Sequence, residues 1–251
     1  MRISAAGLGL FVVTILGASS ARAEGDYLYR AEMIQAAPGK IVELIDLLKA
    51  RSAATLAGGD EAPLWMRHSQ GDHWDLLLLH PMKSYGEYYR AERIERRAKT
   101  QAGAADLGSR IQRDIAWQED LFVNGPPIES VRAAFANASL YHVEIIRALP
   151  GQQADLVKER EMESAFNKNL GRPELLIFVR DQGAAWDLFS IDCYRDIKHY
   201  AESADIPAEK QQAAARAAGY ASPDEIGPKF RAVIATHHDT LAVAAGPAPS
   251  K

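Results

Sequence analysis

Residues 28–36, LYRAEMIQA, return 112 positions later as LYHVEIIRA at residues 140–148. Extended without a gap, residues 28–88 and 140–200 share 18 identities in 61 positions. Ordinary amino-acid composition would produce only about 4 identities by chance. An internal match with one fixed register indicates that a single module has been duplicated within the chain.

Each copy predicts the same order of elements. The first stretch of each copy alternates apolar and polar residues and is followed by Pro-Gly, which is typical of a strand ending in a turn. The expected strands are 27–36, 64–68, 74–80 and 121–123, then 140–148, 175–180, 186–193 and 240–243, with helices over 40–56, 84–118, 152–169 and 197–236. This order, β-α-β-β-α-β, predicts an α+β fold of two tandem ferredoxin-like units. Because each sheet has helices on one face only, we expect the two bare faces to bury each other in one barrel.

The first residues predict export. Met1-Arg2 is followed by an apolar run over residues 5–17 and by the small-residue site Ala21-Arg22-Ala23. This pattern is typical of a signal peptide cleaved before Glu24, so we expect a periplasmic or secreted protein. No later stretch predicts a membrane span. The predicted organisation is a signal peptide (1–23), a first repeat (24–125), a linker (126–138), a second repeat (139–245) and a disordered tail (246–251).

Composition and motifs exclude several classes of function. The chain has 29 basic and 33 acidic residues among 251, so nothing supplies the basic face that nucleic acid requires. Cys193 is the only cysteine, which rules out an intramolecular disulfide and a thiolate metal cluster, and we interpret it as a core residue. No zinc-spaced cluster and no phosphate-binding loop occurs, so no metal site is predicted.

Strand periodicity suggests a polar site inside the barrel. Arg30 and Glu32 share one face of the first strand, and His142 and Glu144 occupy the matching positions of the second copy. We expect the helix-facing side to be apolar, which places these four residues inside. Glu32 and Glu144 would then approach each other across a cavity as an acid/base pair. Two alternatives remain open: the glutamates only fix barrel closure, or the faces are reversed and the tyrosines lie inside.

Other candidates come from differences between the copies. Arg30 corresponds to His142, and His80 corresponds to Asp192. His237 and His238 point to opposite faces of a strand and cannot share one metal ion, although either could be a single axial haem ligand. Trp74 and Trp186, each followed by Asp, predict either an aromatic pocket wall or a duplicated core anchor.

The pattern Tyr-x-x-Glu, Pro-Gly, helix and Trp-Asp strand resembles the dimeric α/β-barrel superfamily. The resemblance is greatest to its NIPSNAP-like and antibiotic-biosynthesis-monooxygenase-like branches, here as a fused tandem forming an intramolecular barrel. It covers most of residues 27–245. It implies a cofactor-free oxygenase, a haem-degrading or haem-binding protein, or a protein with no known activity, because this fold alone does not define a function.

Three functions follow from these observations. The first is an exported protein that binds an apolar or aromatic small molecule, with haem as a candidate ligand although no motif requires a cofactor. The second is a cofactor-independent monooxygenase or isomerase, although the Asn, Trp and His grouping of the family's oxygenases has no counterpart here. The third is a non-catalytic scaffold for a homo-oligomer, which a tightly packed barrel interior would favour.

Overall fold

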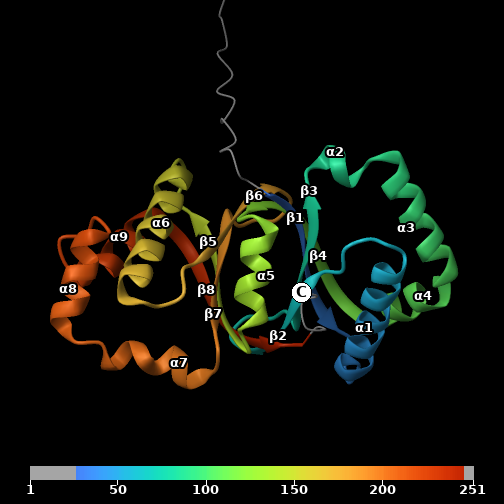
Figure 1. The fold of residues 1–251 in the computed structure, drawn as a ribbon, viewed down its shortest axis with the longest axis horizontal. Coiled ribbons are helices and arrows are strands. Elements are labelled where there is room, and N and C mark those ends of the chain that lie inside the picture. Colours follow the sequence, from blue (N-terminus) through green and yellow to red (C-terminus); the bar gives the residue numbers. More distant parts are fainter. Residues whose placement is uncertain (1–26, 246–251) are drawn as a thin grey trace, which may run out of the picture.

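The computed structural model describes residues 27–245, which form a closed, antiparallel, eight-stranded barrel with helices outside it (Figure 1). The first half comprises β1 (Tyr27–Ala36), α1 (Ile41–Ala57), β2 (Leu64–Gln70), β3 (Leu76–Lys83), α2 (Tyr85–Tyr88), α3 (Ala91–Gly103), α4 (Ala105–Arg113) and β4 (Ile115–Gly125). Then follow α5 (Ile128–Ala136), β5 (Leu140–Ala148), α6 (Gln153–Leu170), β6 (Leu176–Gln182), β7 (Leu188–Tyr194), α7 (Ile197–Ala201), α8 (Ala208–Ala217), α9 (Ile226–Val233) and β8 (Ile234–Ala244). The expected signal peptide and tail lie outside the described residues.

The order of the strands around the barrel is β1-β3-β2-β8-β5-β7-β6-β4. Each half therefore uses the same local order, β4-β1-β3-β2 in the first and β8-β5-β7-β6 in the second. The halves join where β2 pairs with β8 and where β4 pairs with β6. In Figure 1 the barrel stands between one group of helices, α1 to α4, and another, α6 to α9. None of the helices within residues 27–245 has the length and apolarity to cross a bilayer.

The aspartate of the Trp-Asp pair makes an equivalent hydrogen bond in both halves. The Asp75 carboxylate accepts a hydrogen bond from the Ala36 backbone N–H at 2.8 Å, and Asp187 accepts one from Ala148 at 2.8 Å. Each aspartate thus ties the start of the third strand of its half to the end of the first strand. Since a buried backbone N–H needs a partner, these bonds stabilise the same corner of each half.

Two glycines allow the halves to approach each other closely. Gly71, at φ +122°, and Gly183, at φ +95°, occupy hairpin turns in backbone conformations that side chains rarely tolerate. A Cβ atom on Gly71 would collide with the backbone of Asp239, and one on Gly183 would contact Leu121 at 2.8 Å. Each turn therefore packs directly against the last strand of the other half.

Apolar side chains from both halves fill the barrel interior. From β1 these are Tyr29, Ala31 and Met33, and from β5 they are Tyr141, Val143 and Ile145, all in one buried cluster. Inside the same cluster Phe178 and Phe189 stack with ring centroids 4.8 Å apart. An eight-stranded barrel leaves just enough room for its own side chains, and this one is packed in that way.

The interior assignment of the sequence analysis is wrong, and the reversed alternative is the observed one. Arg30, Glu32, His142 and Glu144 lie on the outer face of the barrel, beneath the helices, so Glu32 and Glu144 do not meet across a cavity. The assignment fails because it assumes an apolar helix-facing side. On that side Arg51 of α1 contacts Glu32 and Arg160 of α6 contacts Glu144, and this pairing makes buried charge tolerable there.

Residues 126–138 are more than a linker. They contain α5, which begins after Pro127 and buries Ile128, Val131 and Phe135 against the barrel-interior cluster. The spacing of these three residues is helical, and Pro at the cap position favours a helix start.

The last strand of each half is also longer than predicted. β4 covers Ile115–Gly125 and β8 covers Ile234–Ala244, each taking residues expected to be helical. Polar side chains such as Gln118 and His237 occupy the outer faces of these strands. These polar residues interrupt the alternation of apolar and polar residues that is typical of a strand, so the sequence pattern does not predict the full length of either strand.

Candidate functional site

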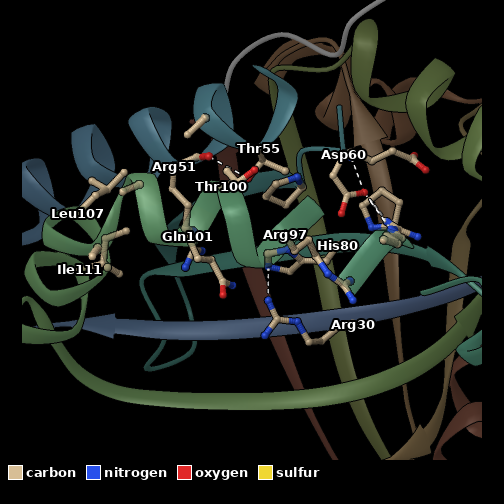
Figure 2. Close-up of a pocket in the computed structure, with 18 of the residues that line it drawn as sticks. Arg30, Arg51, Thr55, Asp60, His80, Arg97, Thr100, Gln101, Leu107 and Ile111 are labelled. Carbon is tan, nitrogen blue, oxygen red and sulfur yellow. Dashed lines mark hydrogen bonds and ion pairs between the residues drawn. The ribbon is translucent and has the colours of Figure 1, made fainter. Parts of the chain in front are cut away.

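The candidate site is a cavity of about 650 Å³ in the first half, between the helices and the outer face of the sheet. Its walls come from α1, α3 and α4, and β1 and β3 form its floor. Figure 2 shows Leu107 and Ile111 of α4 at one end of the cavity. Toward the other end lie Arg30, His80 and Arg97. The cavity is therefore apolar at one end and cationic at the other.

A buried carboxylate anchors the floor. The Glu32 side chain is 2% exposed and lies 2.6 Å from His80 Nε2, 3.3 Å from Arg51 Nη2 and 3.5 Å from Arg30 Nη2. Burial alone would raise the pKa of Glu32, but the hydrogen bond from His80 and the nearby guanidinium groups lower it to about 2. Glu32 is thus a carboxylate at neutral pH and a weak base.

His80 is the neutral partner of that carboxylate. Burial disfavours its charged form, and Arg30 adds repulsion, so that the pKa of His80 is lowered to about 4 despite the hydrogen bond to Glu32. A neutral imidazole carries one proton, and the 2.6 Å contact places it on Nε2, toward Glu32. Nδ1 then keeps its lone pair and can accept a proton.

Two arginines of α3 form the cationic wall. Arg93 is held by Asp60 at 2.8 Å and by the backbone oxygen of Pro81 at 3.1 Å. Arg97 lies over the Tyr88 ring, with its guanidinium carbon 3.8 Å from the ring centroid, and donates through Nη2 to the Tyr88 carbonyl at 2.7 Å. Its Nη1 is buried and has no hydrogen-bond partner among residues 27–245. A buried donor without an acceptor costs free energy.

The matching region of the second half has different chemistry. His142 lies between Asp192 and Asp239, each 3.2 Å from one ring nitrogen. Burial disfavours the imidazolium, but the hydrogen bonds with both carboxylates outweigh it and raise the pKa of His142 to about 10. Burial also raises the pKa of Glu144, which is paired with the buried Arg160. Acidic groups predominate here, whereas arginines predominate in the first half.

The remaining predicted site residues lie away from the cavity. Trp74 is fully buried in the barrel-interior cluster, and Trp186 packs against that cluster at its edge. His237 and His238 lie on β8 and point to opposite sides, as predicted: His237 contacts Asp239 at 3.2 Å, and the exposed His238 contacts Asp72 at 3.3 Å. Cys193 packs against the barrel-interior cluster, which confirms its interpretation as a core residue.

Of the predicted catalytic residues, Arg30 lines the cavity, and Glu32 lies directly beneath it. Sequence reasoning missed Arg51, Arg93 and Arg97 as site residues. The four-residue spacing of Arg93 and Arg97 indicates a shared helix face, but exposed helix faces commonly carry such pairs. The useful signal was the difference between the copies, because Arg30 and His80 are two of the positions at which they diverge.

No protein-family profile and no curated protein matches this sequence. Its fold is similar to that of solved structures with low sequence identity. A candidate monooxygenase of Lactobacillus acidophilus NCFM has a TM-score of 0.54 and 9% identity over 88% of this chain and 95% of that one. An anthrone oxidase-like protein has a TM-score of 0.54 and 13% identity over 88% and 92%. A candidate monooxygenase of Fusobacterium nucleatum has a TM-score of 0.53 and 11% identity over 88% and 94%.

At such identities the likeness shows the fold alone. The chain is an α+β protein with a closed, antiparallel, eight-stranded barrel, and its fold is similar to that of these solved structures.

Proposed function

We propose that this chain is an exported small-molecule-binding protein whose ligand is an amphipathic anion. The observation that carries the proposal is a cavity of about 650 Å³ that has the guanidinium groups of Arg30 and Arg97 toward one end and Leu107 and Ile111 at the other (Figure 2). A carboxylate, sulfonate or phenolate group would pair with these two guanidinium groups. The apolar or aromatic body would extend toward Leu107 and Ile111. The volume lies within the range of about 300–1,000 Å³ typical of small-molecule sites.

The packed barrel interior would by itself favour a scaffold. The cavity on the helix side weighs against that alternative, because a scaffold does not need an open space with guanidinium groups toward one end and apolar side chains at the other. Such a space is what a binding site for an amphipathic anion requires.

A haem group does not fit these residues. Among the described residues, His80 is the only histidine that lines the cavity, and its Nε2 is bonded to Glu32. An iron ion beside that ring would also lie close to the Arg30 and Arg51 guanidinium groups, whose charge opposes it. His237 and His238, the ligands suggested by the sequence, do not line the cavity.

Binding of the amphipathic anion 8-anilinonaphthalene-1-sulfonate, followed by its fluorescence, tests the proposal. We expect one saturable site in the wild type and a roughly 10- to 100-fold weaker affinity in Arg97→Gln, because a charge-assisted hydrogen bond contributes about 1.5–3 kcal/mol. Arg96→Gln is the matched control, since Arg96 is adjacent on α3 but exposed and outside the cavity. Equal losses in both variants, or no saturable site, would contradict the proposal.

A cofactor-free oxygenase or isomerase is the alternative, and His80 favours it. The sequence suggested Glu32 or Glu144 as the base, but Glu32 is buried and has a pKa of about 2. The neutral His80 is better suited: its Nδ1 can take a proton from a C–H group next to a carbonyl, and Arg30 or Arg97 can stabilise the resulting enolate. Oxygen-dependent loss of anthrone that His80→Gln abolishes would support this reaction, and the absence of wild-type turnover would exclude it for anthrones.

We also propose that the protein is exported and that its two halves arose by duplication. Residues 1–23 have the pattern of a signal peptide. We expect protein recovered from a bacterial periplasm to begin at Glu24, which intact mass measurement will check; an intact Met1 would contradict this. The two halves are proposed to be fused ferredoxin-like repeats of NIPSNAP-like type. Their shared strand order and the 18 identities in 61 positions at a register of 112 residues support this proposal.

A further inference from the structure

Three potential metal ligands gather on the outer face of the second half. His142 and Glu144 are two residues apart on β5, and Asp239 lies opposite Glu144 on β8. One ligand atom from each residue lies within 4.8 Å of the other two. His142 Nε2 and Asp239 Oδ1 are already 3.2 Å apart, close to the separation of about 3.3 Å that two ligands of a tetrahedral zinc ion have.

Each of the three side chains is held by a second residue. Asp192 Oδ2 lies 3.2 Å from His142 Nδ1, on the side of the ring away from Asp239. His237 Nε2 lies 3.2 Å from the other oxygen of Asp239, and Arg160 pairs with Glu144. A histidine that donates Nδ1–H to a carboxylate presents Nε2 to a metal ion once the ion displaces the Nε2 proton, and such outer partners are usual around metal ligands.

Carboxylates outnumber the permanent positive charges of this region among the described residues. Glu144, Asp192 and Asp239 surround one imidazole, and the nearby Arg160 is also shared with Glu159 and Glu163. Asp192 is only 7% exposed, yet its Oδ1 has no hydrogen-bond partner within residues 27–245. A buried carboxylate oxygen without a partner needs a nearby donor or cation, such as a water molecule or an ion.

We propose that His142, Glu144 and Asp239 bind one divalent transition-metal ion of the Zn²⁺ or Mn²⁺ class. One imidazole nitrogen and two carboxylate oxygens suit such ions, and the half-exposed Asp239 leaves access for the ion and for a water ligand. This site lies in the other half from the anion cavity and does not depend on it. The first half cannot form the same site, because Arg30 replaces His142 and a guanidinium group cannot act as a ligand.

Calorimetric titration of the untagged, chelator-treated full chain with Zn²⁺ tests the proposal, together with visible absorption after Co²⁺ addition. The wild type is expected to bind one Zn²⁺ per chain and to show the Co²⁺ ligand-field bands of a low-symmetry site. His142→Gln and Asp239→Asn are expected to weaken Zn²⁺ binding at least 100-fold. Asp192→Asn, which alters a positioning residue, is expected to weaken it about 10-fold and to shift the Co²⁺ bands.

His238→Gln is the matched control, because His238 adjoins Asp239 and His237 but is exposed on the opposite side of β8. Its Zn²⁺ affinity should equal that of the wild type. Circular dichroism will show whether each variant folds, and Asp239→Asn keeps the size and shape of a half-exposed side chain. The proposal is overturned if the folded wild type binds no stoichiometric Zn²⁺, if Asp239→Asn binds as tightly as the wild type, or if His238→Gln loses as much affinity.

The two sites can fail separately. His142→Gln should leave binding of 8-anilinonaphthalene-1-sulfonate unchanged, and Arg97→Gln should leave Zn²⁺ binding unchanged.

Discussion

Trp74→Ala will lower the free energy of unfolding by about 3–5 kcal/mol, the usual cost of removing a large buried aromatic side chain. Trp74 is 0% exposed within the barrel-interior cluster. The equivalent Trp186→Ala will cost clearly less, because Trp186 is only partly buried and contacts Phe189 edge-on with ring centroids 5.4 Å apart. Urea unfolding followed by circular dichroism measures both costs.

A milder variant sharpens this comparison. The buried Nε1–H of Trp74 has no hydrogen-bond partner among the described residues, so Trp74→Phe removes an unsatisfied donor along with part of the ring. We expect Trp74→Phe to be much less destabilising than Trp74→Ala. If Trp74→Ala and Trp186→Ala lower the free energy of unfolding equally, the two tryptophans are packed alike. That result would contradict the difference in burial between Trp74 and Trp186.

The second large effect is on the pH dependence of stability. In the unfolded chain His80 takes up a proton near pH 6.5, but in the folded protein its pKa is about 4 because burial and Arg30 oppose the charge. Between these values the unfolded state binds more protons, so stability falls as the pH is lowered from 6.5 to 4. This difference corresponds to about 3 kcal/mol.

His142 acts in the opposite direction. Although burial disfavours its charged form, hydrogen bonds with Asp192 and Asp239 raise its pKa in the folded protein to about 10. Its contribution to stability is therefore complete below pH 6.5 and is lost as the pH rises through 10. Replacing His80 should remove its contribution to the pH dependence of the unfolding free energy on the acid side, and replacing His142 should remove its contribution on the alkaline side.

The measurement is urea unfolding of the metal-free protein, with a chelator present, between pH 4 and 10 for the wild type, His80→Gln and His142→Gln. Carboxylates also titrate at the acid end, so the informative quantity is the difference between each variant and the wild type. We expect His80→Gln to differ in slope only on the acid side and His142→Gln only on the alkaline side. Parallel profiles for all three proteins would contradict the protonation states described for the two halves.

Much of the fold could be predicted because the two similar halves of the sequence repeat the same local signals. The two Pro-Gly turns and the two Trp-Asp corners mark the same boundaries twice, and Asp75 and Asp187 make the same backbone hydrogen bond in each half. The order of strands and helices follows from such signals. The first residues of β4 and β8 could not be predicted in this way, because polar side chains on the outer faces of these strands interrupt the alternation of apolar and polar residues.

The site was harder to predict, for a reason that Glu32 illustrates. A period of two divides β1 into two faces, but both faces are buried here, one in the barrel interior and one beneath the helices. Apolar character therefore does not identify the inner face. Arg51 and Arg97 reach the site from α1 and α3, which the strand pattern does not describe.

By itself the sequence determined the duplicated order of elements, the turns that require Pro, Gly and Asp, and the positions at which the copies differ in charge. All of these depend on backbone preferences and on neighbours within a few residues. Only the tertiary structure decided which strand face is inside, that Arg97 faces a cavity, and that His142 and Asp239, nearly a hundred residues apart, are neighbours. Strand pairing sets those relations, because a shift of one residue in register would turn every side chain of the strand to the other face.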